Sequence, residues 1–515
     1  MARLAVMVEE ERKYEVDTRF TMPDLVAALP PGGRVVERPP VTLTATYFDT
    51  SDLRLARAGA SLRFRRGDEE PWTVKLPADS PGVRHEISRL GQPGTPPADL
   101  VGLVTALSRG APLAPAAVVR TVRRAHEIRD GDDNVLAELA DDTVSVLDGR
   151  RIASRFREVE VERKAGSRKL LDQVEAVLRP AGAVAGGFTP KHVRALGEAA
   201  TREPDLVPPR PLGRKPTAGE VVTEAIRLDI ARILSHDPLV RLRAPVGKDD
   251  TAVHQMRVGA RRLRSDLRTF GPLVDSGWSR GLRDELAWIA AALGAARDAE
   301  VLRARLRRTV AADPLAPLDE VSVARIDADL AARHEDALVE LDAALAADRY
   351  AKLVDMLIEA ARAPRLTSLA GSRASEVLPR LVSRPWRQFA YGAHGVDGAA
   401  DLDPGAPDDR WHDVRIRGKR ARYAVDAVAP VLGGTAAELA KALQAVQDLL
   451  GEHQDAAIAA DTWLSIAQAD PDDHVLAVTA GRLFERERTA IRAVRAQFPD
   501  AWRAANRRRL VEWLP

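Results

Sequence analysis

The chain has 515 residues, in which 77 Lys and Arg are balanced by 75 Asp and Glu, so a formal net charge of +2 gives no global reason to bind a polyanion. It contains no cysteine, which excludes a disulfide scaffold and thiolate metal sites and favours a cytoplasmic location. The longest apolar run, residues 287–296, is about half a membrane span, so neither export nor membrane insertion is expected.

Residues 1–200 are predicted to be rich in strands. Apolar and polar residues alternate with period two, and Gly, Asp and Pro separate the runs, which favours an antiparallel sheet or barrel. Helical periodicity at 99–110 and 167–182 predicts two short helices outside the sheet, and Pro180 and Gly182 end the second. The expected strands are 14–22, 41–50, 60–67, 71–77, 135–149 and 156–166.

Carboxylates alternate in residues 8–16, which we also expect to form a strand, and in the last strand, so each set points to one face. Facing rows of carboxylates would repel, but on a barrel interior they are explained by hard ions such as Mg²⁺ or Mn²⁺, which also hold substrate phosphates. The alternative is a solvated outer face, which either row alone would favour. Complementary charges on several strands make it less favourable. The acidic rows are Glu9 and Glu11, followed by Lys13, and Glu158, Glu160 and Glu162.

The pattern of Glu9, Glu11 and Lys13 resembles the signature of the CYTH, or triphosphate tunnel metalloenzyme, superfamily. The stretches YFDT, LRFR, TVKL, RHE, AELADD and EVEVERKAG add to the resemblance, which covers residues 1–200. It implies an eight-stranded antiparallel tunnel that binds a triphosphate. The phosphate-binding residues that it implies are Lys13, Arg63, Arg65, Lys75, Arg123 and Lys191. The implied ligands of Mg²⁺ or Mn²⁺ are Glu9, Glu11, Glu158, Glu160 and Asp142, with Glu162 as a further candidate.

Prolines predict an irregular linker at 201–216, and the remainder, 217–515, is helical in period. A second irregular stretch, 394–410, divides this region into halves of about 217–393 and 410–515. An internal repeat supports the division. His254, Arg257, Arg261 and Arg264 recur 158 positions later (412 minus 254) as His412, Arg415, Lys419 and Arg422.

A second motif follows in both halves. LGAARDAEVL is echoed by LGEHQDAAIA, which matches Gly294 with Gly451 and Asp298 with Asp455. We therefore expect two related helical halves packed about a pseudo-twofold axis.

Each repeated set forms one cationic stripe, because its offsets fall within about 80° of the helix circumference. Like charges so placed destabilise a helix by about 0.2–0.5 kcal/mol per pair, and a bound polyanion would relieve them. The alternative is that the arginines lie over apolar neighbours and pair with acids on adjacent helices. Nucleic acid is not favoured, because aromatic residues are 4% of the chain and do not interleave with the stripes.

The two stripes and the LGAARDAEV segment resemble the CHAD domain, an all-helical domain of two pseudo-symmetric halves associated with binding inorganic polyphosphate. The resemblance covers residues 217–515 and implies that both stripes line a basic groove. One departure is Asp426, which stands where the first half has Arg268.

The expected activity is metal-dependent hydrolysis of a small triphosphate, with inorganic triphosphate favoured. Glu160 or Glu162 would position and deprotonate the attacking water, and Lys13 would contribute to the catalytic site. The helical domain would hold polyphosphate and could associate the protein with polyphosphate granules. The alternatives are a non-catalytic polyphosphate-binding protein, or a tunnel enzyme acting on ATP or thiamine triphosphate, for which Tyr47 and Trp72 are candidate contacts.

Overall fold

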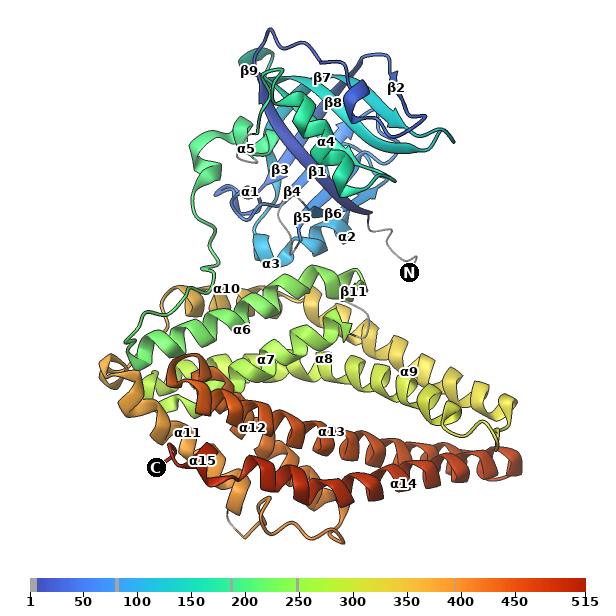
Figure 1. Cartoon of the computed structure of the whole chain (residues 1–515), viewed down its shortest axis with the longest axis vertical. Coiled ribbons are helices and arrows are strands. Elements are labelled where there is room, and N and C mark those ends of the chain that lie inside the picture. The colour runs from blue at the N-terminus through green and yellow to red at the C-terminus, as the bar shows by residue number, and fades with distance from the viewer. Residues whose placement is uncertain (1–6, 79–82, 186–188, 247–249, 394) are drawn as a thin grey trace. The chain divides into compact units, whose positions relative to one another are not determined.

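The structure is a computed structural model that describes residues 7–78, 83–185, 189–246, 250–393 and 395–515, without the side chains of residues 7–9 (Figure 1). The chain forms two compact units, and the division between them falls at Leu206 and Val207. Within the described ranges no helix is long and apolar enough to cross a membrane.

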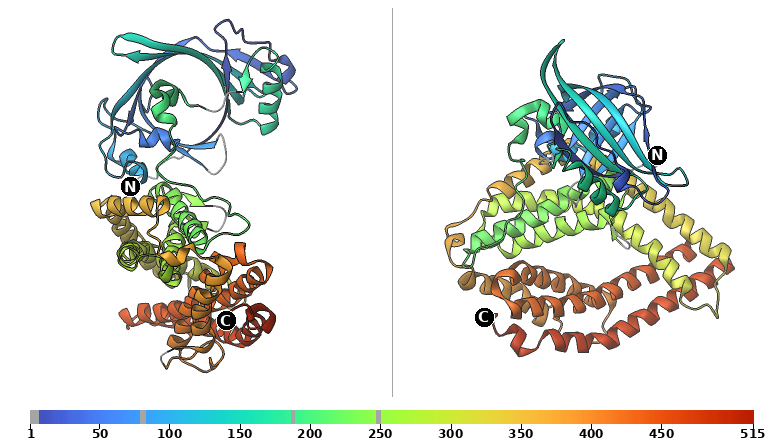
Figure 2. Two further views of the ribbon diagram at one scale, coloured as in Figure 1. Left: turned by 90° about the vertical axis from the view of Figure 1, so that its left-hand side faces the viewer. Right: turned by 45° about the horizontal axis from the view of Figure 1, so that its top comes forward.

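The first unit is a closed barrel. Its eight strands follow the order β1-β6-β5-β4-β3-β7-β8-β9, and β9 pairs back onto β1, with every pairing antiparallel. Figure 2 shows the closed ring end-on. The short strands β2 and β10 pair with β7 and β1, respectively. The strands are β1 (Met7–Val16), β2 (Arg34–Glu37), β3 (Val41–Asp49), β4 (Ser61–Arg66), β5 (Trp72–Pro77), β6 (Val83–Arg89), β7 (Ala114–Arg129), β8 (Val135–Asp148), β9 (Arg151–Arg163) and β10 (Val184–Ala185).

Three strand predictions need correction. The first strand is Met7–Val16, as the alternation of Glu9, Glu11 and Lys13 predicted, but it does not continue to residue 22, because a turn at Asp17 ends it: Phe20 N–H donates to the Asp17 carbonyl at 3.0 Å. The predictions also omit β6 and β7. Both faces of these strands carry charged residues, so the hydrophobic alternation that reveals a strand is weak there.

The helix predicted at 167–182 lies outside the barrel, as expected. Leu171 and Val174 of α4 (Arg168–Leu178) share an apolar core with Tyr14, Val159 and Val161, which point outward from β1 and β9. This outer core leaves the alternate residues of the same strands facing inward. The other helices of this unit are α1 (Arg54–Arg57), α2 (Ala98–Leu103), α3 (Thr105–Ser108) and α5 (Lys191–Leu196), with 3₁₀ turns at Val26–Ala28 and Gly197–Thr201.

The second unit is helical apart from a two-stranded ladder, β11 (Pro245–Val246) and β12 (Asp250–Thr251). Its helices are α6 (Ala218–Arg241), α7 (Ala252–Thr269), α8 (Ser276–Ala311), α9 (Glu320–Ala346), α10 (Asp348–Arg362), α11 (Ala374–Tyr391), α12 (Asp408–Leu432), α13 (Gly434–Ala469), α14 (His474–Ala505) and α15 (Arg508–Val511), with 3₁₀ turns at Gly271–Leu273 and Ser368–Gly371.

The internal repeat is visible in these helices. The series α6 to α9 corresponds to α11 to α14, and α8 and α13 each have 36 residues. The pairs α8/α9 and α13/α14 form two long hairpins that run in the same direction (Figure 1). Leu306, Leu330, Trp463 and Leu483, one from each of these four helices, share an apolar core. The predicted fold class, an eight-stranded barrel followed by a pseudo-symmetric all-helical domain, is confirmed.

Candidate functional site

The barrel encloses a cavity of ≈ 300 Å³ whose wall is almost entirely charged and polar. Because side chains alternate along a strand, each strand sends every second residue into it. Ten of the predicted tunnel residues line this cavity: Glu11, Lys13, Arg63, Arg65, Lys75, Arg123, Asp142, Glu160, Glu162 and Lys191.

Two other predicted residues do not line the cavity in the described structure. The side chain of Glu9 lies outside the described part, and its backbone pairs with that of Arg84. Glu158 is buried and does not line the cavity, but its carboxylate lies 2.9 Å from Lys191 Nζ. Burial raises the pKa of Glu158, and Lys191 offsets this effect only in part.

The carboxylates of β8 and β9 are held by three cations. Lys191 Nζ lies 2.7 Å from Asp142 Oδ2 and 2.9 Å from Glu160 Oε2. Lys13 Nζ lies 2.5 Å from Glu160 Oε1, and the Arg123 guanidinium donates to both oxygens of Asp142 at 2.7 and 2.9 Å. Burial opposes the charge on Glu160, but the three cations hold its pKa well below the usual value.

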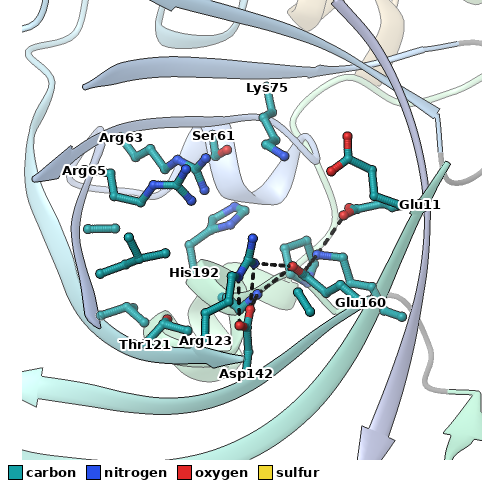
Figure 3. Close-up of a pocket in the computed structure, with 18 of the residues that line it drawn as sticks. Glu11, Ser61, Arg63, Arg65, Lys75, Thr121, Arg123, Asp142, Glu160 and His192 are labelled. Carbon is teal, nitrogen blue, oxygen red and sulfur yellow. Dashed lines mark hydrogen bonds and ion pairs between the residues drawn. The ribbon is translucent and has the colours of Figure 1, made fainter. Parts of the chain in front are cut away.

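The opposite wall carries a surplus of positive charge (Figure 3). Arg63, Arg65 and Lys75 of β4 and β5 lie across the cavity from Asp142 and Glu160. Burial, together with the charge of Arg63, lowers the pKa of Arg65 although Asp68 lies 2.6 Å from it. A wall whose guanidiniums repel each other is stabilised by a bound anion.

In the helical unit, the central cations of the two stripes lie against each other. Burial and the charges of Arg415, Arg261 and Arg257 lower the pKa of Lys419 to about 6. Burial and neighbouring arginines also lower the pKa values of Arg261 and Arg415, although Asp455 opposes the effect at Arg415 and Lys419. Cations of α7 and α12 therefore form one cluster, which we call the α7/α12 cation cluster: Arg257, Arg261, Arg415 and Lys419.

The residues matched by the second repeated motif lie beside this cluster. Asp298 of α8 pairs with Arg257 at 2.9 Å, and Asp455 of α13 acts on Arg415. The corresponding Arg and Asp thus interact in each half, as an ion pair at 2.9 Å between Arg257 and Asp298 and through the charge of Asp455 at Arg415.

Comparison with known proteins identifies both domains. The CYTH domain family matches residues 7–183, and the CHAD domain family matches residues 224–464. The uncharacterized proteins MT2285 and Rv2226 of Mycobacterium tuberculosis, from strains CDC 1551 / Oshkosh and ATCC 25618 / H37Rv, are each 32% identical over 530 residues, which cover 97% of this chain and 97% of theirs. The chain belongs to the CYTH–CHAD family.

Two solved structures are similar to part of this CYTH–CHAD chain. PptA from Streptomyces chartreusis is 25% identical with a TM-score of 0.44, covering 56% of this chain and 99% of its own. The CHAD domain from the plant Ricinus communis is 23% identical with a TM-score of 0.42, covering 56% of this chain and 96% of its own.

The CYTH cavity offers carboxylate oxygens of the kind that Mg²⁺ and Mn²⁺ prefer. Glu11, Glu162 and Glu138 occupy directly opposite register positions on β1, β9 and β8, and all three line the cavity. Among the described residues, no three acidic or histidine side chains are already arranged around a common point. The donor chemistry therefore fits a divalent ion, with Glu11 and Glu162, which were predicted, and Glu138, which was not.

Sequence reasoning missed several residues that line the CYTH cavity. Arg84 and Glu86 alternate on β6, a signal that was available in the quoted RHE stretch. Glu86 forms an ion pair with Lys75 at 2.9 Å, and its carboxylate lies 3.9 Å from the Arg63 guanidinium. No pattern in the sequence pointed to His192, because it lies on a short helix rather than on a barrel strand.

The ends of the CHAD stripes differ from the prediction. Arg422 turns to Asp426, 3.4 Å away, while Arg420 lies close enough to Arg264 and Arg268 for their charges to lower its pKa, after the effect of burial. His412 Nδ1 lies 2.5 Å from Gln454 Oε1. The pKa of His254 is lowered by burial and by Arg297. Asp426, the departure noted in the sequence, thus redirects the end of the second stripe.

Proposed function

We propose that the CYTH domain hydrolyses a small triphosphate, inorganic triphosphate first of all, with Mg²⁺ or Mn²⁺, and that the CHAD domain binds inorganic polyphosphate. Members of the CYTH family are triphosphate tunnel enzymes with triphosphatase or cyclase activity. The observation that carries the proposal is the closed cavity, in which ten charged residues expected from the sequence meet. Arg63, Arg65 and Lys75 lie across it from Asp142 and Glu160, which are held by Lys13, Arg123 and Lys191.

The lining of the cavity favours a substrate without a base or ring. Trp72 is fully buried in the barrel core and does not line the cavity. Tyr47 lines it, but its ring stacks on that of His192 at 5.1 Å between centroids, and the two residues are only 6% and 5% exposed. No described lining residue therefore presents an open aromatic face on which adenine or a thiazolium ring could stack.

The cationic residues would bind and orient the triphosphate. Arg63, Arg65 and Lys75 would hold phosphate oxygens on one wall, and Arg123 and Lys191 would do so from the other. A bound divalent ion would neutralise phosphate charge and activate a water molecule. The best-suited residues to hold it are Glu11, Glu138 and Glu162.

Of the two candidate bases, Glu162 is the better suited. Both oxygens of Glu160 are already held by cations, and its lowered pKa makes it a weak proton acceptor. Glu162 lines the cavity and pairs with Lys164. We therefore assign Glu160 to positioning Lys13, Arg123 and Lys191, and Glu162 to orienting the attacking water.

Phosphate release by the purified full chain tests the CYTH proposal. We expect Mg²⁺- or Mn²⁺-dependent release from inorganic triphosphate that exceeds release from ATP and thiamine triphosphate. Glu11→Gln should lower kcat/KM by about 100-fold or more. Glu10→Gln is the matched control, because Glu10 pairs with Arg163 on the outside of the barrel at 2.7 Å. If the wild type releases no more phosphate than Glu11→Gln does, the result would favour a non-catalytic binding protein.

Polyphosphate binding by the CHAD domain rests on the α7/α12 cation cluster. Burial, followed by repulsion from Arg415, Arg261 and Arg257, lowers the pKa of Lys419, and a bound polyanion would offset the repulsion and favour the charged form. Lys419→Gln should weaken binding of long-chain polyphosphate by about tenfold in a filter assay. Lys441→Gln on the exposed face of α13 is the control and should bind as the wild type does. Equal binding by both variants would remove the cluster from the proposed site.

A further inference from the structure

His192 is a buried side chain of the CYTH cavity, and none of the binding or catalytic roles proposed above is assigned to it. It is 5% exposed, lines the cavity and projects into it from α5 (Figure 3). Its Nε2 atom is buried and has no hydrogen-bond partner. Buried polar atoms are rarely left unpaired in native proteins, so an unpaired one facing a cavity indicates a ligand.

The backbone fixes the state of this ring. A hydrogen bond with the backbone of Ala60 favours the protonated ring, so the ring is the donor. Because Nε2 has no partner, this donor is Nδ1, and Nε2 of the neutral ring carries a lone pair. Stacking on Tyr47, with an angle of 22° between the ring planes, holds the ring in this orientation.

The surroundings of Nε2 are cationic on several sides. Burial, and then Arg84 of β6, Lys13 of β1 and Arg63 of β4, lower the pKa of His192 to about 3. Tyr47 of β3 covers the ring, and Lys191 precedes it on α5. Arg63 itself has a buried Nε atom without a hydrogen-bond partner. His192 and Arg63 therefore both line the cavity and each has a buried nitrogen without a hydrogen-bond partner. The Arg63 atom is a donor, and the His192 atom carries a lone pair because burial and the neighbouring cations keep the ring neutral.

A bound phosphate reverses this balance. A triphosphate brings several negative charges among these cations, which offsets the part of the pKa shift that the cations add to burial. A protonated Nε2–H can then donate a charge-assisted hydrogen bond to a phosphate oxygen, whereas the neutral ring offers only a lone pair that repels it.

We propose that His192 is a substrate contact that binds a phosphate oxygen of the triphosphate through Nε2 and takes up one proton as it does so. The proposal rests on triphosphate binding in the CYTH cavity. His192 then acts with Arg63 as a hydrogen-bond donor to the chain of phosphates. It also makes binding dependent on pH: affinity falls as the pH rises toward the pKa that His192 has in the complex.

Calorimetric titration of the full chain with inorganic triphosphate in EDTA tests the contact without turnover. Titrations in two buffers of different ionisation enthalpy give the number of protons taken up. His192→Phe keeps a ring to stack on Tyr47 but removes the nitrogens, and His192→Gln keeps a polar group that does not titrate. His126→Gln is the matched control, because His126 is on β7 but does not line the cavity.

We expect the wild type and His126→Gln to take up about one proton more than His192→Phe and His192→Gln. Isotope-labelled histidine in the wild-type chain adds a second readout, for which a variant is needed only to assign the signals. The His192 ring signal should shift from the neutral to the protonated position on binding. The contact would be overturned if the wild type binds triphosphate tightly, but its His192 ring signal does not shift and its proton uptake equals that of His192→Phe. The proposed function would then remain intact. If the wild type does not bind triphosphate at all, the proposed function fails first.

Discussion

Lys191 holds three buried carboxylates at once, within 2.7–2.9 Å of Asp142, Glu158 and Glu160. Its own burial opposes its charge, but these acids raise its pKa overall. Such a lysine stabilises the barrel in addition to its proposed role as a phosphate ligand, because its removal leaves like charges facing each other in a poorly solvated space.

Lys191→Met should therefore destabilise the CYTH domain by about 3 kcal/mol, as expected for one partner removed from a buried ion pair. Adding Glu158→Gln should recover part of that loss, because Glu158 depends on Lys191 and does not line the cavity. Denaturant unfolding of the two variants and of Glu158→Gln alone gives the coupling. A single Lys191→Met variant as stable as the wild type would contradict this account.

The helical unit contains a pair of buried carboxyls. Asp229 of α6 and Asp266 of α7 are hydrogen-bonded to each other, and Arg262 lies 3.6 Å from Asp229. Burial raises the pKa of Asp229 to about 7, although Arg262 opposes the effect. Burial, followed by the charge of Asp229, raises the pKa of Asp266 well above its usual value.

The direction of the pH dependence follows from these raised pKa values. Each carboxyl binds its proton more tightly in the folded chain, so its contribution is complete below the unfolded pKa and is lost as the pH rises through the folded pKa. From pH 5.5 to 8 the stability of the helical unit should fall by about 1–2 kcal/mol through Asp229. Asp229→Asn should flatten this dependence in denaturant unfolding followed by helical circular dichroism, because it removes the carboxyl whose burial raises the pKa. An equally steep dependence in the variant would exclude the pair as its cause.

At the scale of the elements, α7 is held close to α6 by a glycine. A Cβ atom at Gly259 would lie 2.8 Å from Ile233 Cγ1 and 3.1 Å from the Asp229 carbonyl oxygen. In the second half, a Cβ atom at Gly418 of α12 would lie 3.1 Å from Phe389 of α11. The two helices that carry the α7/α12 cation cluster are thus each packed closely against the helix before them.

Gly259→Ala should destabilise the helical unit by about 1–3 kcal/mol, because the backbone of α6 has to move. Gly281→Ala is the control: it lies in α8 with open space around its Cβ position and should stabilise by about 0.5–1 kcal/mol. Denaturant unfolding compares the two. If both variants were stabilised, the close approach of α6 and α7 would be incorrect.

At the scale of the whole molecule, the two units have separate cores and separate charged sites. The proposed division of labour assigns triphosphate to the CYTH cavity and polyphosphate to the α7/α12 cation cluster. Neither site uses a residue of the other unit.

Arg261→Gln with Arg415→Gln should therefore weaken polyphosphate binding by about 100-fold while changing kcat/KM for triphosphate by no more than about twofold. Glu11→Gln should have the opposite pattern. Both quantities are measured on the full chain under one set of salt conditions, because polyanion affinity depends on ionic strength. Equal losses of both activities in either variant would contradict the division.

The sequence by itself determined the class of each unit and the inward face of most strands. Three local patterns can be recognised without knowledge of the fold. They are the hydrophobic period of two, the row of Glu11 and Lys13, and the repeat of His254 at His412. Together with the resemblance to the CYTH superfamily, they predicted ten residues that line the cavity. Strands whose two faces are both charged, β6 and β7, gave no such pattern and were missed.

Only the tertiary structure decided which charges meet. Closure of β9 onto β1 places Lys13 against Glu160, and α5 adds Lys191 and His192 to the same cavity. The packing of α7 against α12 brings Lys419 to Arg261, while Asp426 draws Arg422 aside. Ion pairing and burial depend on distances between residues far apart in the chain. Their pKa values and their pairing therefore arise from packing, which no local periodicity contains.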